Sequence, residues 1–432
     1  MKITFIRPNI MDGRSADAVQ PLAVAALAAH TPGDVELEFY DECVEEVPHD
    51  LRTDLVAMSV HTFAARRAYR MADRFRQRGI PVILGGYHPS FMPEEALEHA
   101  DAVVAGHAEG SWESVVRDLR EGKLGRIYAS QRLPQGEELR YDMRLFRGKK
   151  YIPVVPVEFT RGCRFDCEFC SVSAFNQNTH ITRPHAAVIE DIRRSGAKRI
   201  MFVDDNIFSN REEAQRLFQA LIPLKIKWGC QVSLDIARNP DTLKLMARSG
   251  CVVFMIGFES LRRENLRQMQ KGSHTSETSY GKALARIRDQ GIMVYGSFVF
   301  GYDFDTEDVF DQTLEFATKH KFVIANFNTL NPMPGTRLYE RLKAEGRLLE
   351  EQWWLHEKVK YGEVMFLPKR LSPDQLKEGC IRLRFQFSKP AGIARRALDL
   401  KANARNPGNL GLFLLANLIT RKEYKAKMRL VR

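Results

Sequence analysis

Residues 160–170 read Thr-Arg-Gly-Cys-Arg-Phe-Asp-Cys-Glu-Phe-Cys, and they place Cys163, Cys167 and Cys170 within eight positions of one another. An apolar run over 154–159 precedes them and predicts a strand, so the three thiols are expected on the loop that follows it. Three thiolates on one loop can bind three irons of a [4Fe–4S] cluster and leave the fourth iron open for another ligand. Structural zinc is the alternative, but it usually takes four protein ligands.

The other four cysteines stand alone in the sequence. Cys230, Cys251 and Cys380 could in principle supply a fourth metal ligand, but each lies in an apolar context that is typical of a buried structural thiol. Cys43 follows a predicted strand and is expected to be packed in the same way. The first residues lack the apolar segment of an export signal. The odd number of seven cysteines therefore predicts a metal site in the reducing cytoplasm rather than disulfides.

Strand and helix patterns alternate downstream of the cysteine loop. The candidate strands are 154–159, 199–203, 227–232, 252–256, 293–300 and 323–328. Six strand–helix units are too few for a closed eight-stranded barrel, so we predict a partial (β/α)6 barrel over 151–345. The chemistry of such a barrel is expected at the carboxyl ends of its strands.

Residues 1–124 predict a separate α/β domain. Its apolar runs alternate with helical patterns, which is typical of a doubly wound, Rossmann-like parallel sheet. The predicted strands are 2–6, 35–40, 55–60, 81–84 and 102–105. A segment rich in Gly, Arg and Lys over 125–150 is predicted to be the linker to the barrel.

Small and polar residues follow three strands of this first domain. They are Ser59, Thr62, Gly85, Gly86, Gly106 and His107. Parallel strands end at the same edge of a sheet, so these residues are predicted to surround a ligand, which glycines allow the backbone to approach closely. Tight turns between strand and helix are the alternative at each position taken singly. No G-x-G-x-x-G segment follows the first strand, so a dinucleotide site is not supported.

The C-x3-C-x-Phe-C spacing after the first barrel strand resembles that of the radical S-adenosylmethionine (SAM) superfamily. The resemblance implies that Cys163, Cys167 and Cys170 bind a [4Fe–4S] cluster whose open iron chelates SAM. It also implies that Phe169 packs near the adenine of SAM. In that superfamily, an electron from the cluster cleaves SAM and yields a 5′-deoxyadenosyl radical that abstracts hydrogen from unactivated carbon.

Further stretches resemble one branch of that superfamily, the branch with an N-terminal cobalamin-binding domain. They are Phe202-Val-Asp-Asp205, Gly257-Phe-Glu259-Ser260, Gly301 to Thr306 and Asn331 to Thr336. The resemblance implies that Asp204, Asp205 and Glu259 contribute to SAM binding, and Asp235, after the third barrel strand, is a further candidate. Capping of the following helix is the alternative for Asp204 and Asp205.

The same resemblance implies that the strand-end residues of the first domain bind cobalamin. The stretch from Arg7 to Gly13, after the first strand, has no histidine where methyl-transferring cobalamin domains often carry D-x-H-x-x-G. We therefore expect cobalamin without an imidazole from this loop on its lower face. A domain that has lost the cofactor and serves as a scaffold is the alternative.

The branch resemblance predicts cobalamin-dependent methylation of an unactivated carbon in a small or lipid-like metabolite, with electrons from a flavodoxin- or ferredoxin-type donor. Radical cyclisation, oxidation or rearrangement, with or without cobalamin, is the alternative outcome, and no residue of the sequence specifies the fate of the substrate radical. A zinc-bound binding protein without activity is a third and different class. No catalytic residue beyond the cofactor ligands can be assigned from the sequence.

The positive charge of the chain is concentrated in its last part. The 432 residues carry a net charge of +11, of which +9 lies in 389–432. Residues 346–432 predict a helical extension, in which an apolar run over 410–419 is too short to span a bilayer. Its neighbouring basic residues suit a helix at an anionic membrane surface, whereas docking on the barrel is the alternative. Nucleic acid is disfavoured, since no aromatic-rich basic stripe is present. We expect a cytoplasmic protein, with peripheral membrane contact if the membrane interpretation of the tail holds.

Overall fold

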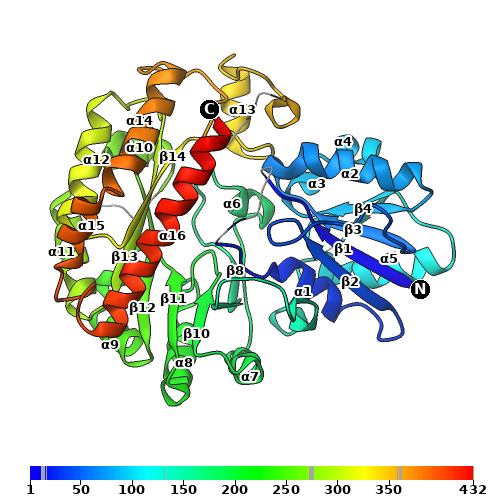
Figure 1. Cartoon of the computed structure of the whole chain (residues 1–432), viewed down its shortest axis with the longest axis horizontal. Coiled ribbons are helices and arrows are strands. Elements are labelled where there is room, and N and C mark those ends of the chain that lie inside the picture. Colours follow the sequence, from blue (N-terminus) through cyan, green and yellow to red (C-terminus); the bar gives the residue numbers. More distant parts are fainter. Residues whose placement is uncertain are drawn as a thin grey trace. The chain divides into compact units, whose positions relative to one another are not determined.

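The computed structural model describes residues 1–10, 15, 17–130, 132–271, 277–357, 359 and 362–431. The chain forms two compact units (Figure 1). The first unit contains Met1–Ile152 together with two later segments, Met333–Thr336 and Gln352–Val359. The second unit contains Pro153–Pro332, Arg337–Glu351 and Lys360–Arg432.

The first unit is built on a parallel sheet of six strands in the order β2-β1-β3-β4-β5-β6. The strands are β1 (Lys2–Arg7), β2 (Glu36–Asp41), β3 (Leu55–Ser59), β4 (Val82–Gly85), β5 (Ala102–Ala105) and β6 (Ile127–Ala129). The central strands are nearly continuous runs of buried apolar residues, because helices cover both faces of a doubly wound sheet. The strand order reverses between β1 and β3, where sheets of this class usually bind their ligands.

The helices of the first unit follow the strands with short connections. They are α1 (Leu22–Ala29), α2 (Ala65–Gln77), α3 (Tyr87–Phe91), α4 (Pro93–His99) and α5 (Trp112–Arg120). In α2 the buried residues Ala65, Ala68, Ala72 and Phe75 recur every three to four positions, so this helix presents one apolar side to the core despite its five arginines. The predicted doubly wound domain is confirmed.

The structure differs from the prediction over 125–150, which was expected to be a linker. This segment adds β6 to the edge of the sheet, where it pairs with β5. Further along, Phe146 packs edge-to-face against Phe39 with 5.5 Å between ring centroids. The segment belongs to the first unit. A strand of three partly exposed residues is too short to show a hydrophobic period, which is why the sequence pattern did not indicate it.

The second unit contains a parallel sheet of six strands whose spatial order follows the chain. The strands are β7 (Val155–Val157), β10 (Arg199–Phe202), β11 (Lys227–Gln231), β12 (Cys251–Glu259), β13 (Met293–Phe300) and β14 (Ile324–Thr329). Each strand pairs with the next, and β7 and β14 lie at the two ends of this order. This is the predicted partial barrel, and the predicted α/β fold class is confirmed.

Helices alternate with these strands, as Figure 1 shows for α11 and α12 beside β12, β13 and β14. The helices are α6 (Ser171–Phe175), α7 (His185–Ser195), α8 (Arg211–Leu221), α9 (Pro240–Arg248), α10 (Arg263–Gln268), α11 (Glu277–Asp289), α12 (Asp308–Lys319) and α13 (Arg337–Ala344). An aromatic stack that includes Phe258, Phe298 and Phe327 fills the space beneath α12, with 5.5 and 5.9 Å between successive ring centroids. This close packing of aromatic rings holds the strands in place.

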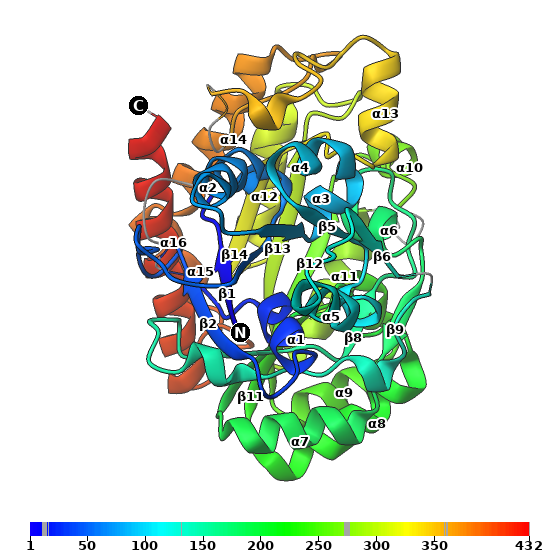
Figure 2. The same ribbon diagram turned by 90° about the vertical axis from the view of Figure 1, so that its right-hand side faces the viewer.

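The C-terminal extension consists of α14 (Pro373–Phe387), α15 (Pro390–Ala397) and α16 (Pro407–Val431). Figures 1 and 2 both show α16 beside β14 and α15. Phe413 is fully buried, and Asn417 Nδ2 donates to the Val323 carbonyl over 3.0 Å. Arg396 is also buried and donates to Asn417 Oδ1 over 3.1 Å. One side of α16 is therefore docked on the barrel. None of the described helices is both long and apolar enough to cross a membrane.

Candidate functional site

The three clustered cysteines lie on the connection that leaves the first strand of the barrel. A short antiparallel pair, β8 (Thr160–Gly162) with β9 (His180–Thr182), brackets this connection, and α6 begins directly after Cys170. Cys167 is buried, whereas Cys163 and Cys170 are partly exposed. Two hydrogen bonds fix the course of the loop: Ser173 Oγ donates to the Phe165 carbonyl over 2.9 Å, and the Glu168 amide donates to the Met269 carbonyl over 3.1 Å.

Helix α13 holds the same loop from another direction. The Leu338 amide donates to the Glu168 carbonyl over 3.0 Å, and Arg341 Nη2 lies 2.9 Å from Glu168 Oε1. Arg337 Nη2 donates to the Asp166 carbonyl over 2.7 Å. The α13 residues that make these contacts follow the cysteine loop by about 170 residues in the sequence. No local pattern near the cysteines indicates them. The cysteine loop is thus held in place by partners outside its own motif.

Asp204 and Asp205, predicted to bind SAM, follow β10 and accept hydrogen bonds from the start of the cysteine loop. Asp204 Oδ1 accepts from the Phe159 amide over 2.7 Å, and Asp205 Oδ2 accepts from the Gly162 amide over 2.8 Å. Burial raises the pKa of Asp204 well above its usual range and that of Asp205 to about 6. The next helix, α8, is instead capped by Asn210. The two aspartates therefore brace the loop in this structure.

Asp235 lies beside the cysteine loop as well. Its carboxylate forms an ion pair with Arg164, the residue after Cys163, and accepts a hydrogen bond from the Ser233 hydroxyl. The Arg164 guanidinium lies over the Phe165 ring, 4.9 Å from its centroid. The prediction that Asp235 belongs to the same edge of the barrel agrees with this placement, whereas its role toward SAM stays a prediction.

Glu259 ends β12 and pairs with a lysine that the sequence pattern did not indicate. Lys271 Nζ lies 2.5 Å from Glu259 Oε1 and donates to the Gly257 carbonyl over 2.8 Å. Lys271 lies after α10, twelve residues beyond Glu259, and no sequence motif marks it. The side chain of Phe169, the remaining SAM candidate, packs edge-to-face on Tyr302 with 6.4 Å between ring centroids.

The thiols of this loop suit an iron–sulfur cluster. Burial raises the pKa of Cys163 and raises that of Cys167 to about 12. The positive charge of Lys271 opposes both shifts without reversing them. All three cysteines are free of disulfides. Among the described residues, no three His, Cys, Asp or Glu side chains converge on a position for a single metal ion. A [4Fe–4S] cluster binds its thiolates through different irons, so it suits three thiols spread along one loop.

The six residues predicted to bind cobalamin lie at neighbouring strand ends in the first unit. Ser59 and Gly85 end β3 and β4, and the Val60 amide donates to the Gly85 carbonyl over 2.8 Å. Gly86 and Gly106 are joined through Ser90, whose Oγ donates to the Gly86 carbonyl over 2.7 Å and accepts from the Gly106 amide over 2.8 Å. The sequence analysis did not single out Ser90.

Two glycines at this edge have a positive φ but differ in their surroundings. Gly86 has a φ of +95°, and a Cβ there would lie 2.9 Å from the Val60 carbonyl oxygen. Gly106 has a φ of +80°, and a Cβ there would meet nothing within 4 Å, so space is open beside it. Thr62 and His107 are each 6% exposed. In the stretch from Arg7 to Gly13, residues 11–13 lie outside the described residues.

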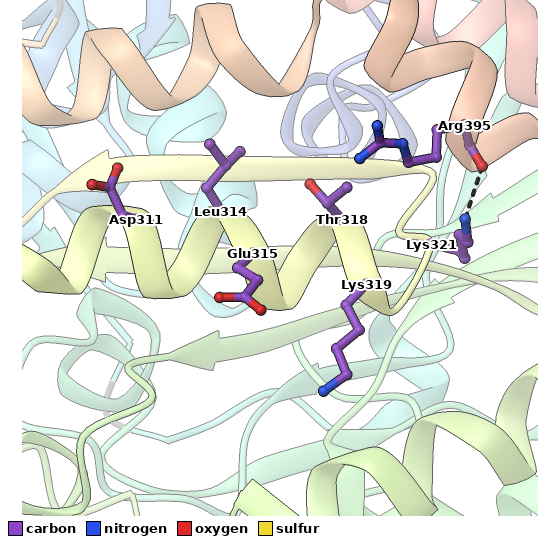
Figure 3. A pocket seen from close by; sticks show the side chains of 7 residues that line it. All are labelled: Asp311, Leu314, Glu315, Thr318, Lys319, Lys321 and Arg395. Carbon is purple, nitrogen blue, oxygen red and sulfur yellow. Dashed lines mark hydrogen bonds between the residues drawn. The ribbon is translucent and has the colours of Figure 1, made fainter.

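A hollow beside α12 is shown in Figure 3. Its volume is about 370 Å³, and α12 contributes most of its lining, with one residue from α15. The lining residues are Asp311, Leu314, Glu315, Thr318, Lys319, Lys321 and Arg395. None of them is a predicted cofactor residue, and their charges are of both signs. This hollow is therefore separate from the candidate site.

Comparisons with known proteins agree with both halves of this description. The Radical SAM superfamily matches residues 157–317, and the B12 binding domain matches residues 12–116. Bacteriochlorophyllide d C-12(1)-methyltransferase of Chlorobaculum tepidum is 29% identical over 87% of this chain and 84% of its own length. Hopanoid C-2 methylase of Rhodopseudomonas palustris is 25% identical over 77% of this chain and 66% of its own length.

Among solved structures, the radical SAM methyltransferase TsrM from Kitasatospora setae, with cobalamin and a [4Fe–4S] cluster bound, has the same fold. It superimposes with a TM-score of 0.69 over 98% of this chain and 99% of its own, at 13% identity. The Radical SAM match and this fold thus define a radical SAM enzyme. The chain belongs to the branch of that superfamily that carries an N-terminal B12-binding domain, and its two domains are those that bind cobalamin and, at a [4Fe–4S] cluster, SAM. The zinc-protein alternative is set aside.

Proposed function

We propose that this protein is a cobalamin-dependent radical SAM methyltransferase that methylates an unactivated carbon of a lipid-like, polycyclic substrate. The observation that carries the proposal is a cysteine loop braced at the carboxyl edge of a partial barrel, in a chain that also has a B12-binding domain. The two curated relatives described above are named for methylating a bacteriochlorophyllide and a hopanoid. Both of those substrates are extended ring systems with much apolar surface, which supports a substrate of that class here.

In the proposed cluster site, Cys163, Cys167 and Cys170 bind three irons and leave the fourth for SAM. When bound there, the cluster would supply the electron for the cleavage of SAM to methionine and a 5′-deoxyadenosyl radical, and cobalamin would carry the methyl group. Asp204 and Asp205 keep the start of the loop fixed, because each accepts a backbone hydrogen bond from it. The electrons are proposed to come from a flavodoxin- or ferredoxin-type protein.

Around SAM we propose contacts from Phe169, Asp235 and Glu259, which the resemblance and the barrel edge both favour. In the first unit, the proposed cobalamin site comprises the strand-end residues Ser59, Thr62, Gly85, Gly86, Gly106 and His107. The open space beside Gly106 and the bonds through Ser90 support this assignment, since they keep two strand ends fixed where a large ligand can reach the backbone.

The decisive experiment combines cofactor content with product analysis. The protein would be purified anaerobically with hydroxocobalamin present, and iron, sulfide and cobalt would be quantified on one sample. The loaded enzyme would then be incubated with SAM, a one-electron reductant, and bacteriochlorophyllide d or a hopanoid. Methylation requires a product heavier by one CH2, with S-adenosylhomocysteine and 5′-deoxyadenosine formed together. Formation of 5′-deoxyadenosine with no methylated product and no S-adenosylhomocysteine would instead support cyclisation, oxidation or rearrangement.

We also propose that the C-terminal extension contacts an anionic membrane surface. Its exposed leucines support this: Leu398 and Leu400 are each 77% exposed, and Leu414, Leu415 and Leu418 on α16 are 42, 50 and 64% exposed. The α16 leucines recur at helical spacing, opposite the docked residues Phe413 and Asn417, and the exposed Lys422 and Lys425 continue the same side. Leucines flanked by lysines suit the interface of a bilayer with anionic headgroups, where a lipid-like substrate would also lie.

A further inference from the structure

The carboxyl end of β12 contains a buried ion pair between Glu259, a proposed SAM contact, and Lys271. The side chains of Glu259 and Lys271 are each only 11% exposed, and Nζ lies 2.5 Å from Oε1. The same Nζ donates to the Gly257 carbonyl over 2.8 Å, so the lysine contacts both the side chain and the backbone of this strand end. A buried pair of this kind must overcome the cost of taking two charges out of water, which makes its presence informative.

The backbone of β12 is distorted around this pair. The pairing of β12 with β13 shifts register between Gly257 and Glu259, which is a local irregularity of the bulge type. Glu259 itself has a φ of +61°, a left-handed conformation that is unfavourable for any residue with a Cβ. Bulges and left-handed residues of this kind redirect side chains near functional sites. Here the residue at the distortion, Glu259, is the one that pairs with Lys271.

Gly257 leaves the space that the pair occupies. A Cβ at this position would lie 2.1 Å from Glu259 Oε1 and 2.9 Å from Lys271 Nζ. The glycine, the register shift and the left-handed glutamate are three separate features of the strand end. All three occur at the same ion pair, and the glycine leaves the space that the two side chains occupy.

The segment that carries Lys271 contacts the cysteine loop. The Met269 carbonyl, two residues before Lys271, accepts a hydrogen bond from the Glu168 amide over 3.1 Å. Glu168 directly follows Cys167, so the buried lysine lies two residues from a direct contact with the loop.

We propose that Lys271 is a positioning residue of the cofactor site, which seats the Glu259 carboxylate and places a buried positive charge beside the cysteine loop. This rests on the proposed function in one respect: Cys163, Cys167 and Cys170 must bind a cluster. One-electron reduction by the protein donor adds one negative charge to that cluster. A nearby cation stabilises the reduced form, so it raises the reduction potential and makes the electron easier to accept.

The test is an anaerobic redox titration of the cluster-loaded full-length protein, followed by electron paramagnetic resonance. Four variants are compared with the wild type: K271M, K271R, E259Q and K343M. Lys343 is the matched control, because its Nζ pairs with Glu351 Oε2 over 2.7 Å at an exposed position, with 46 and 62% side-chain exposure. Iron and sulfide are quantified on every sample, so each potential is measured on a protein of known cluster content.

We expect opposite shifts from the two halves of the pair. K271M removes the positive charge and moves the midpoint potential to a more negative value, whereas E259Q removes the negative charge and moves it to a more positive one. K271R keeps the charge and stays near the wild-type potential, and K343M stays unchanged. SAM should bind more weakly to both K271M and E259Q. Its binding is measured by the change that SAM causes in the electron paramagnetic resonance spectrum of the reduced cluster.

Two results would overturn the assignment of Lys271. One is a K271M protein with full cluster content and the wild-type potential. The other is a shift of K271M and E259Q in the same direction, which would indicate a change of fold rather than of charge. If K271M cannot retain iron, the E259Q protein still tests whether the charges of this pair change the reduction potential of the cluster. A wild-type protein that binds no cluster at all would instead refute the proposed function.

Discussion

Asp205 Oδ2 accepts a hydrogen bond of 2.8 Å from the backbone amide of Gly162, the residue directly before the first cysteine of the loop. Gly162 has a φ of +85°, and a Cβ there would lie 2.3 Å from the Thr179 carbonyl oxygen, so the loop turns here in a way that only glycine permits. The carboxylate thus holds a backbone position directly before the thiols that requires glycine.

Replacement of Asp205 by Ala should therefore loosen the cluster before it affects the fold. A buried hydrogen bond to a charged acceptor contributes about 1.5–3 kcal/mol. We expect D205A to lose iron about tenfold faster than the wild type when the loaded protein is challenged with a chelator under anaerobic conditions. D241N is the control, since Asp241 is fully exposed on α9. Equal rates of iron loss in D205A and wild type would show that Asp205 does not brace the loop.

The cysteines make a sharper test of which thiols bind iron. C163A, C167A and C170A should each retain little iron and give no SAM cleavage. C380A should keep both the iron and the SAM cleavage, because Cys380 is 1% exposed on α14, within the hydrophobic core of the second unit and outside the cysteine loop. Iron content after desalting measures this directly. Loss of iron in C380A, in a protein that unfolds at the wild-type temperature, would contradict the three-cysteine assignment.

The cysteine loop and the strands could be read from the sequence because their signals are local. Three cysteines in eight positions stand out whatever surrounds them, and buried parallel strands such as β3 and β13 are apolar runs of ordinary length. By contrast, β6 is a partly exposed edge strand of three residues, which carries no detectable period. Its place in the sheet depends on pairing with β5, which is a tertiary contact.

The partners of the site residues could not be read in the same way. Lys271 is one basic residue among 65, and only the fold brings it to the end of β12. Ser90 likewise joins two glycines from different strand ends, of which Gly106 is sixteen residues away. A motif shows which residues suit a chemistry, whereas the residues that hold them in place are chosen by packing and have no fixed spacing.

The glycines of the first unit provide a test of the cobalamin site. G86A adds a Cβ that would lie 2.9 Å from the Val60 carbonyl oxygen at a left-handed backbone position. We expect G86A to lower the retention of cobalt by at least about tenfold. The control is G79A, because Gly79 has a similar φ of +74° but nothing within 4 Å of the added Cβ, so it measures the backbone cost alone.

S90A separates the strand-end geometry from steric effects. It removes two hydrogen bonds, each worth about 1 kcal/mol, without adding an atom. Cobalamin affinity should fall by about five- to thirtyfold, measured by the change in visible absorption when hydroxocobalamin is titrated into the protein. An unchanged affinity in both S90A and G86A would place the cobalamin site elsewhere.

The stability of the barrel should depend on pH through Asp305. Burial raises the pKa of this carboxyl to about 6, although the Gly301 amide and Asn265 donate hydrogen bonds to it over 2.8 and 2.7 Å. The unfolded chain has the ordinary pKa of 3.8. Between these values the folded state binds more protons than the unfolded state, so the contribution of Asp305 to stability grows as the pH falls through 6 and shrinks as it rises.

Urea unfolding at pH 7 and pH 5 checks this. The free energy of unfolding of the wild type should gain about 1 kcal/mol relative to that of D305N on going from pH 7 to pH 5. D305N is less stable at both values, because its amide cannot accept both hydrogen bonds equally well, but the comparison depends only on the change with pH. Parallel changes in the two proteins would mean that Asp305 titrates at its ordinary pKa.

The exposed leucines of α16 lead to the last prediction. Full-length protein should co-sediment with vesicles that contain anionic phosphatidylglycerol more strongly than with neutral phosphatidylcholine vesicles, and high salt should weaken binding because screening reduces the lysine contribution. The double variant L415E/L418E should bind at least about tenfold more weakly, since two large apolar side chains are lost from the interface. The double variant L349E/L367E is the control, because those leucines are 50 and 45% exposed outside α16. Equal binding of all three proteins to the vesicles would show that the α16 leucines do not contact the membrane. Loss of self-association in L415E/L418E at high protein concentration would instead show that these leucines contact a second copy of the chain.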